Sequence, residues 1–393
     1  MKTNWQIKKL DEVCEIVKDT PPEYMGIKNY FSTGAISNNS FYFPEEVACK
    51  KRPSRANSYP KTGDVGFAKM KFTNKVLLIS DDLNGSIFST GFCFLRPNKL
   101  LDSRYLFHFI ISDEFQKLKN LYAGDGIMGG IKNSDVKKVE IPLPLLSEQR
   151  RIVKILDEVF KKTAKTKENA EKNLQNAKEL FESYLQSIFT NPKKDWEEKT
   201  LKELGKITSS KRIYKKEYAK NGIPFYRIKE IKELANSKEI SLKLFISKER
   251  YDEIKKTFGI PIIGDILMTA VGTIGEIYVV CNKDEFYFKD GNILWFKYFK
   301  SVNPYFLKYV LVFFVEQIKK LSKGSAYNAL TIEKIEKHKI FIPRSISEQK
   351  SIVKKLDKLS AQTKKLEEIY KEKLLDLKEL KKSVLKRAFN GEL

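Results

Sequence analysis

The segment from Ser147 to Thr190 occurs twice in this chain, and this repeat is the feature that most restricts how the chain can fold. A second copy begins at Ser347 and follows the first without a gap. Roughly 18 of the 44 paired positions are identical, far more than chance would give. The chain is therefore an internal duplication, and its two halves should fold in similar ways.

Both copies are predicted to be long helices. Neither contains proline or glycine up to Phe189 or Phe389, and both are rich in Lys, Glu, Leu and Ala, which lose little conformational freedom in a helix. Ser147 and Ser347 are the predicted N-caps, since an acidic residue follows each in the first turn and a proline precedes each. A helix of this length would be a rod of roughly 60 Å.

Apolar residues in both copies recur at alternating steps of four and three, which is typical of a coiled coil. A helix of this kind has to bury its seam, and the nearest equivalent partner is the other copy. A two-fold arrangement of the repeat requires the helices to run antiparallel, with the globular parts at opposite ends. The predicted seam residues are Leu156, Phe160, Thr163, Lys167, Ala170, Leu174, Ala177, Phe181, Tyr184 and Ile188 in the first copy and Leu359, Thr363, Leu366, Tyr370, Leu377, Leu380 and Val384 in the second.

The remaining sequence predicts a β-rich globular part before each helix. Short apolar runs alternate with clusters of Gly, Asn, Ser and Pro, which is typical of strands joined by exposed loops. Amphipathic helices are expected at 105–118 and 305–318. The fold class is thus α+β with a pseudo-two-fold repeat, and the predicted domains are a globular domain at 1–146, a helix at 147–190, a second globular domain at 191–346 and a second helix at 347–393.

The chain is strongly basic. Lys and Arg number 74 against 50 Asp and Glu, which gives a net charge of +24. An excess of this size attracts polyanions, so nucleic acid is the leading predicted partner. The four cysteines lie far apart, as expected of free thiols in the cytoplasm. The longest apolar run, near 305–315, is broken by Lys308 and too short to span a bilayer, so no membrane is expected.

No catalytic motif is recognisable. The chain lacks the G-x-x-x-x-G-K-[ST] loop that binds nucleotide phosphates. Asn303-Pro304 is better explained as a helix start than as a methyltransferase motif. His108 and His338 each stand alone, which favours neither metal ligation nor a histidine base.

Binding chemistry is better supported, because basic stretches in both globular parts also carry amide and hydroxyl side chains. Lys and Arg suit phosphates, while Arg, Asn and Ser can also address base edges in the major groove. The candidate DNA contacts are Lys50, Lys51, Arg52, Arg55, Asn57, Tyr59 and Lys61 in the first part, and Lys211, Arg212, Tyr214, Lys215, Arg227, Lys229, Thr273, Tyr327 and Asn328 in the second.

The repeated motifs resemble those of the specificity subunit of type I restriction-modification systems. The resemblance rests on Leu143-Pro144 before Ser147-Glu148-Gln149 and Ile152, on Ile342-Pro343 before Ser347-Glu348-Gln349 and Ile352, on two Trp-led openings, and on the ending Ala388-Phe389-Asn390-Gly391-Glu392-Leu393. It implies two target recognition domains, each reading half of a split target in double-stranded DNA, joined by two helices that form an antiparallel coiled coil.

The resemblance also implies partners. Two methyltransferase subunits would dock on the helices, and restriction subunits with translocase and nuclease activity could join them. The chain itself would be non-catalytic, with S-adenosylmethionine, ATP and Mg bound by the partner subunits and the target adenines flipped into the methyltransferase.

The sequence is also compatible with two alternatives from other functional classes. One is a self-sufficient DNA-modifying enzyme whose motifs have drifted, and the other is a coiled-coil scaffold whose globular parts bind protein. Methyl transfer by the chain alone would support the first. A lack of salt-sensitive duplex binding would support the second.

Overall fold

The computed structural model describes residues 5–393 apart from 38–39, 42–43, 125–128, 243 and 322–330. The chain divides into two compact units: unit 1 contains Met1–Lys172 and Tyr370–Leu393, and unit 2 contains Asn173–Ile369. The division falls within two long helices, α5 (Leu146–Thr190) and α11 (Ile346–Phe389). Each unit is therefore a globular part together with a portion of both helices.

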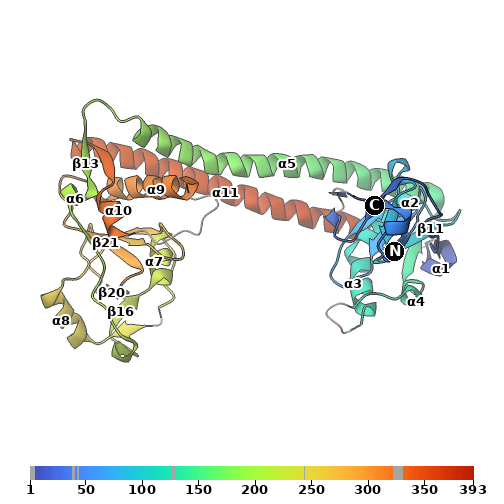
Figure 1. Cartoon of the computed structure of the whole chain (residues 1–393), viewed down its shortest axis with the longest axis horizontal. Coiled ribbons are helices and arrows are strands. Elements are labelled where there is room, and N and C mark those ends of the chain that lie inside the picture. The colour runs from blue at the N-terminus through green and yellow to red at the C-terminus, as the bar shows by residue number, and fades with distance from the viewer. Residues whose placement is uncertain (1–4, 38–39, 42–43, 125–128, 243, 322–330) are drawn as a thin grey trace. The chain divides into compact units, whose positions relative to one another are not determined.

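The described part of unit 1 contains two four-stranded sheets, with strand orders β2-β11-β8-β9 and β6-β3-β10-β7, and a ribbon in which β1 pairs with β12. Strand β11 of the first sheet is labelled in Figure 1. The elements are β1 (Gln6–Lys9), α1 (Leu10–Val13), β2 (Cys14–Ile16), β3 (Ile27–Phe31), β4 (Ile36–Ser37), β5 (Ser40–Phe41), β6 (Glu45–Ala48), the 3-10 turn η1 (Cys49–Lys51), β7 (Ala56–Ser58), β8 (Val65–Ala68), β9 (Val76–Leu78), η2 (Asp81–Leu83), β10 (Ile87–Ser89), β11 (Phe92–Pro97), α2 (Ser103–Ile111), α3 (Asp113–Tyr122), α4 (Asn133–Val136) and β12 (Glu140–Leu143).

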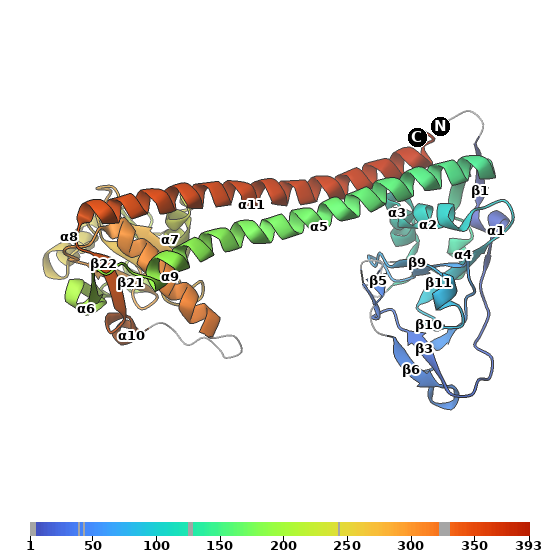
Figure 2. The ribbon, with the colours of Figure 1, turned by 90° about the horizontal axis from the view of Figure 1, so that it is seen from above.

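The sheet β2-β11-β8-β9 is the middle layer of unit 1. Side chains alternate between the two faces of a strand. Val65 and Phe67 share a core cluster with residues of α2, α3, α5 and α11, whereas Ala68 and Phe94 share another with Phe88 of the second sheet. Figure 2 shows the same order, from the long helices through β9 and β11 to β10, β3 and β6. The sheet β6-β3-β10-β7 is thus the layer farthest from the helices.

Unit 2 repeats this plan. Its middle sheet has the order β14-β21-β18-β19, the ribbon pairs β13 with β22, and the parallel pair β16 and β20 matches the parallel pair β3 and β10. The internal repeat is therefore confirmed. The elements are β13 (Trp196–Thr200), α6 (Leu201–Leu204), β14 (Lys206–Thr208), η3 (Lys215–Glu217), β15 (Tyr218–Ala219), β16 (Ile223–Tyr226), α7 (Ile228–Ala235), β17 (Phe245–Ile246), α8 (Lys248–Thr257), β18 (Ile266–Thr269), β19 (Ile277–Val279), β20 (Tyr287–Phe288), β21 (Ile293–Lys297), α9 (Pro304–Leu321), α10 (Ile332–Glu336) and β22 (Lys339–Pro343).

Within each unit the two long helices pair in antiparallel fashion, as predicted. In unit 1 the start of α5 meets the end of α11, where Arg151 Nη2 donates a hydrogen bond to the Leu393 carbonyl at 2.6 Å. In unit 2 the end of α5 meets the start of α11, and Leu185 and Leu356 share one buried cluster. The α+β fold class with an antiparallel coiled coil is confirmed.

The helix starts differ from the prediction. Helical hydrogen bonding begins before the two serines, since the Gln149 N–H donates to the Leu145 carbonyl and the Gln349 N–H donates to the Ser345 carbonyl. Ser345 Oγ accepts a hydrogen bond from the Glu348 N–H at 3.4 Å, which makes it the capping residue of α11. Ser147 and Ser347 therefore lie inside the first turn and were wrongly predicted as N-caps.

The predicted seam of α5 is correct over its first half except at Lys167, which is exposed, and it then shifts by one residue. Leu156, Thr163, Ala170 and Ala177 are buried, but the next buried position is Leu185 rather than Tyr184. An α-helix has 3.6 residues per turn, so a strict heptad drifts around its surface and the buried stripe moves on by one residue. In α11 the same shift makes Leu385 the buried position in place of Val384. The predicted seam residues Leu366 and Leu380 are exposed.

The predicted helix at 105–118 is in fact two helices. Ser112 ends α2, and its Oγ accepts a hydrogen bond from the Phe115 N–H at 3.3 Å, which starts α3. A serine in the middle of an amphipathic stretch can thus cap a new helix and turn the chain. The matching stretch of unit 2 is one continuous helix, α9. Within the described residues no helix has the length and apolar content needed to cross a bilayer.

A buried glutamine attaches each long helix to its globular part. Gln149 Oε1 accepts from the Asp102 N–H at 2.8 Å, and its Nε2 donates to the carbonyls of Leu100 and Pro144. Gln349 makes the same three bonds in unit 2, to the Asn303 N–H and to the carbonyls of Ser301 and Pro343. The glutamine of the Ser-Glu-Gln motif therefore ties the helix start to the loop before α2 or α9 and to the preceding strand.

A second repeated contact uses different chemistry in the two units. His108 Nε2 lies 3.0 Å from Asp157 Oδ1 in unit 1, and the Tyr309 hydroxyl donates to Asp357 Oδ1 in unit 2. Burial lowers the pKa of His108, although the hydrogen bond and charge of Asp157 oppose this. His108 is thus held neutral at physiological pH against the α5 helix.

The low pKa of His108 predicts that unit 1 loses stability in mild acid. An unfolded histidine takes up a proton near pH 6.5, whereas folded His108 does so only at lower pH. Stability is therefore full above about pH 6.5 and falls as the pH drops below it, by at most about 1.4 kcal/mol per pH unit. The His108→Tyr variant places in unit 1 the residue type that unit 2 has at the equivalent position. Its stability should no longer depend on pH through this residue. Urea unfolding between pH 7.5 and 5.5 measures it, and equal pH slopes for both proteins would contradict the prediction.

Candidate nucleic-acid interface

Two turns of unit 1 meet at one end of the middle sheet. The turn between β8 and β9 (69–75) lies beside the turn between β10 and β11, because the Lys69 N–H donates to the Gly91 carbonyl at 3.0 Å. The second turn also contacts the loop before β7, since the Thr90 N–H donates to the Arg55 carbonyl at 2.9 Å. We call the surface formed by residues 69–75, 90–91 and Arg55 the unit 1 corner.

The unit 1 corner is basic. It carries Lys69, Lys71, Lys75 and Arg55, and Lys75 Nζ donates to the Thr33 carbonyl beside it. The three lysines are not among the residues predicted from the sequence to contact DNA. The signal that could have found them is their spacing around Phe72, between two strands, since basic and aromatic residues often alternate on surfaces that bind nucleic acid.

The helix α3 holds the 69–75 turn in place. Lys119 is fully buried and its Nζ donates to the Thr73 carbonyl, while Asn120 Oδ1 accepts from the Phe72 N–H at 2.9 Å. Burial lowers the pKa of Lys119 to about 8. The segment that follows α3 adds a backbone bond from the Ile131 N–H to the Lys69 carbonyl. The turn is therefore supported along its length.

Of the residues predicted to contact DNA in unit 1, only Arg55 lies at this corner. Tyr59 lies where β10 begins, and its hydroxyl accepts from Lys28 Nζ at 2.8 Å. Arg52 Nη2 donates a hydrogen bond to Asn57 Oδ1 at 3.3 Å, so each side chain uses part of its hydrogen-bonding capacity on the other. Lys61 Nζ lies 3.9 Å from Asp19 Oδ2. Lys50 and Lys51 are exposed on η1, which follows the end of β6 that pairs with Ile27.

Unit 2 has an equivalent corner. The Ala270 N–H donates to the Asn292 carbonyl at 2.9 Å, so the turn between β18 and β19 (270–276) lies beside the turn before β21. The 270–276 turn is built on glycine: Gly272 and Gly275 have positive φ, and a Cβ at Gly275 would lie 2.4 Å from Val315 Cγ1. Thr269 Oγ1 donates to the Thr273 carbonyl and leaves the Thr273 side chain exposed.

The predicted stretch at 211–215 reaches this unit 2 corner. Arg212 Nε donates to Asp290 Oδ2 at 2.7 Å, and this bond raises the pKa of Arg212. The neighbouring Gly291 N–H donates to Ser209 Oγ at 2.9 Å. Lys211, Tyr214 and Lys215 are exposed beside Arg212. Residues 209–212, 270–276 and 290–292 therefore form one surface, which we call the unit 2 corner.

Arg227 and Lys229 are less available than their sequence suggests. Arg227 Nη2 lies 3.0 Å from the buried carboxylate of Glu230, and this partner raises the pKa of Arg227. Lys229 Nζ lies 3.8 Å from Glu233. These two basic residues lie at the start of α7 and pair with acids of the same helix, and they lie outside the unit 2 corner defined above. The other two candidates, Tyr327 and Asn328, lie outside the described residues.

The isolated histidines have structural surroundings. His338 packs against Phe314, with ring centroids 4.1 Å apart, and His108 contacts Asp157. Among the described residues, no three His, Cys, Asp or Glu side chains are grouped so that they could hold a metal ion.

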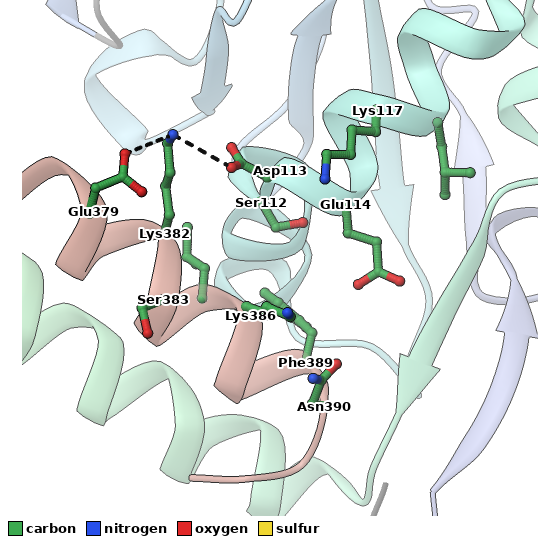
Figure 3. A pocket seen from close by; sticks show the side chains of 12 residues that line it. Ser112, Asp113, Glu114, Lys117, Glu379, Lys382, Ser383, Lys386, Phe389 and Asn390 are labelled. Carbon is green, nitrogen blue, oxygen red and sulfur yellow. Dashed lines mark hydrogen bonds and ion pairs between the residues drawn. The ribbon is translucent and has the colours of Figure 1, made fainter.

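A hollow of about 710 Å³ lies in unit 1 between α3 and the end of α11 (Figure 3). Lys382 of α11 reaches Asp113 of α3 at 3.9 Å and Glu379 of its own helix at 3.1 Å. Leu118, Leu385 and Phe389 add apolar surface. The hollow thus combines charged groups with apolar side chains at the junction between helix and globular part.

The chain is similar to proteins of one family along nearly its whole length. The model of the type I restriction modification DNA specificity domain matches residues 2–176 and 193–375. A putative type I restriction enzyme specificity subunit of Haemophilus influenzae is 28% identical over 68% of this chain and 67% of its own length. The MjaIX specificity subunit of Methanocaldococcus jannaschii is 26% identical over 99% of this chain and 94% of its own length.

Two solved structures share the fold. A chain from a study of complex assembly and conformational transition in a type I restriction-modification system has a TM-score of 0.83 at 24% identity, covering 100% of this chain and 99% of that one. The HsdS subunit of Thermoanaerobacter tengcongensis has a TM-score of 0.68 at 24% identity, covering 100% of this chain and 98% of the other. The duplicated architecture is thus shared along the entire chain.

Proposed function

This chain belongs to the type I restriction modification DNA specificity family, and on that premise we propose how it recognises DNA. Each unit binds one half of a gapped target in double-stranded DNA through its corner, and the paired helices set the separation of the two half-sites. Affinity comes from phosphate contacts by Lys and Arg, and specificity comes from contacts to base edges.

The observation that carries this proposal is the repeated corner with different side chains. In both units a turn of seven residues follows an inner strand of the middle sheet, β8 or β18, and lies beside the turn before β11 or β21. An arginine, Arg55 or Arg212, belongs to the same surface. The unit 1 turn carries lysines and Phe72, whereas the unit 2 turn carries glycines and Thr273. Recognition of two half-sites with different sequences requires different side chains on the same backbone arrangement, and the two corners have this property.

We propose that methyltransferase subunits dock on the helices. Each unit leaves large apolar side chains exposed there: Leu375 and Leu380 in unit 1, and Leu180, Leu366 and Ile369 in unit 2. Exposed apolar groups of this kind are typical of protein interfaces. The hollow beside Lys382 (Figure 3) would receive a partner side chain that complements its charged groups.

The chemistry would then belong to the partners. S-adenosylmethionine would be bound by the methyltransferase, and ATP and Mg²⁺ by restriction subunits where these join the complex. The chain would act in the cytoplasm on cellular DNA, and the target adenine would be flipped into the methyltransferase.

The test is a map of adenine methylation in the host, with and without this gene. We expect one gapped motif to lose its methylation when the gene is deleted. Exchanging residues 69–75 should then alter only one half of the motif, and exchanging 270–276 only the other. Methyl transfer by the purified chain alone would instead indicate a self-sufficient enzyme. An unchanged map, together with no salt-sensitive duplex binding in the presence of methyltransferase, would indicate a protein-binding scaffold.

A further inference from the structure

Phe72 is displayed at the tip of the unit 1 turn in an unfavourable backbone conformation. Its side chain is 80% exposed, and its φ is +59°, a region that residues other than glycine rarely adopt. An exposed aromatic ring contributes little to folding, and a left-handed backbone at such a residue costs stability. Neither feature is explained by packing within the chain.

The surrounding structure holds this conformation. Asn120 Oδ1 accepts from the Phe72 N–H at 2.9 Å, and Lys119 binds the carbonyl of the next residue, Thr73. On the other side, the Lys71 N–H donates to the Gly129 carbonyl at 2.9 Å, and Lys71 Nζ donates to the Gly124 carbonyl at 3.0 Å. Hydrogen bonds thus hold three consecutive residues at the tip, and the backbone that carries the ring is rigid.

The ring lies beside one lysine in a turn that is basic as a whole. Lys71 Nζ lies 5.5 Å from the centre of the Phe72 ring, and Lys69, Lys75 and Arg55 belong to the same corner. A polyanion attracted to these groups would meet Phe72 first, because it is the most exposed of the large apolar side chains in the turn. In the unit 2 turn the same position, the fourth residue after the strand, is the exposed Thr273.

We propose that Phe72 inserts its ring between two stacked base pairs of the half-site that unit 1 binds, and so acts as a specificity-determining wedge. This inference rests on the proposed function. Several proteins that bend DNA use apolar wedges such as phenylalanine in this way, and base steps differ in how readily they unstack. The turn that carries the ring has to be rigid, because a mobile ring would move aside rather than separate two bases. The lysines would hold the flanking phosphates.

The experiment uses the full chain with its methyltransferase partner and duplexes of the mapped target. 2-Aminopurine is placed at each step of the half-site in turn. For the wild type we expect a severalfold rise in fluorescence at one step of the unit 1 half-site and none in the unit 2 half-site. In Phe72→Ala the rise should vanish, and affinity should fall roughly 10- to 100-fold, as expected for loss of base stacking. The salt slope should stay the same, and Phe72→Trp should keep the signal.

Two controls separate a wedge from a structural role. Phe72→Gly suits the left-handed backbone, so it should raise the unfolding midpoint while it weakens target binding. Leu100→Ala removes another exposed apolar side chain of unit 1, 56% exposed, and should change neither readout. Unchanged fluorescence and affinity in Phe72→Ala, with target binding otherwise intact, would overturn the wedge alone. A wild-type complex without preference for a gapped target would overturn the proposed function itself.

Discussion

Replacing Gln349 by leucine is expected to lower the free energy of unfolding by about 3–5 kcal/mol. The side chain is fully buried and makes three hydrogen bonds, to the Asn303 N–H and to the carbonyls of Ser301 and Pro343. Leucine has nearly the same size but leaves these backbone groups without partners in a site closed to water. Each buried group left unsatisfied costs about 1–3 kcal/mol. Urea unfolding followed by circular dichroism would measure the loss.

The controls for this prediction lie on the same helices. Gln149 makes the equivalent three bonds in unit 1, so Gln149→Leu should have a similar cost. Gln175 is exposed on α5 and bonds only to Glu179, so Gln175→Leu should change stability by less than about 0.5 kcal/mol. If all three variants lost the same small amount, the attachment of each helix by its buried glutamine would be disproved.

The long helices could be predicted because their information is local and repeated. Composition, the absence of helix breakers and the two copies of Ser-Glu-Gln all lie in one continuous stretch. The role of the glutamine could not be predicted from that stretch. Its partners Asp102 and Asn303 are distant in sequence, and they bind the glutamine through backbone groups. The late shift of the seam to Leu185 and Leu385 follows helical drift. A heptad count does not include that drift.

The corners were only partly predictable for a related reason. Arg55 and Arg212 are predicted DNA contacts because they are basic residues in loops. Their place at the corners depends on the backbone contact between Thr90 and Arg55 and on the bond from Arg212 to Asp290. Arg227 meets the same criterion but lies at the start of α7, paired with Glu230. Basic character alone therefore does not predict which side chains lie at a corner, because that depends on contacts between residues distant in sequence.

Replacing Lys69, Lys71 and Lys75 together by alanine is expected to weaken binding of the target duplex by roughly 100- to 1,000-fold at 0.1 M salt. Each lysine that contacts a phosphate contributes about one unit to the slope of log affinity against log salt concentration. The slope should therefore become shallower by about two to three units. Lys71 and Lys75 already donate to backbone carbonyls, but a carbonyl does not cancel their charge. Fluorescence anisotropy of labelled duplex across a salt series would measure both quantities.

The matched control keeps the charges. Arginine at the same three positions should retain the salt slope within about half a unit, because counterion release depends on the number of cations rather than on their shape. Thr273→Ala in unit 2 should behave differently again, with the slope unchanged and the preference for one base pair reduced, since a threonine contacts bases or phosphates without charge. If the alanine variant kept the wild-type slope, phosphate binding would have to lie elsewhere on unit 1. The exposed Lys50 and Lys51 on η1, at the other end of the sheet β6-β3-β10-β7, would then be the residues to replace next.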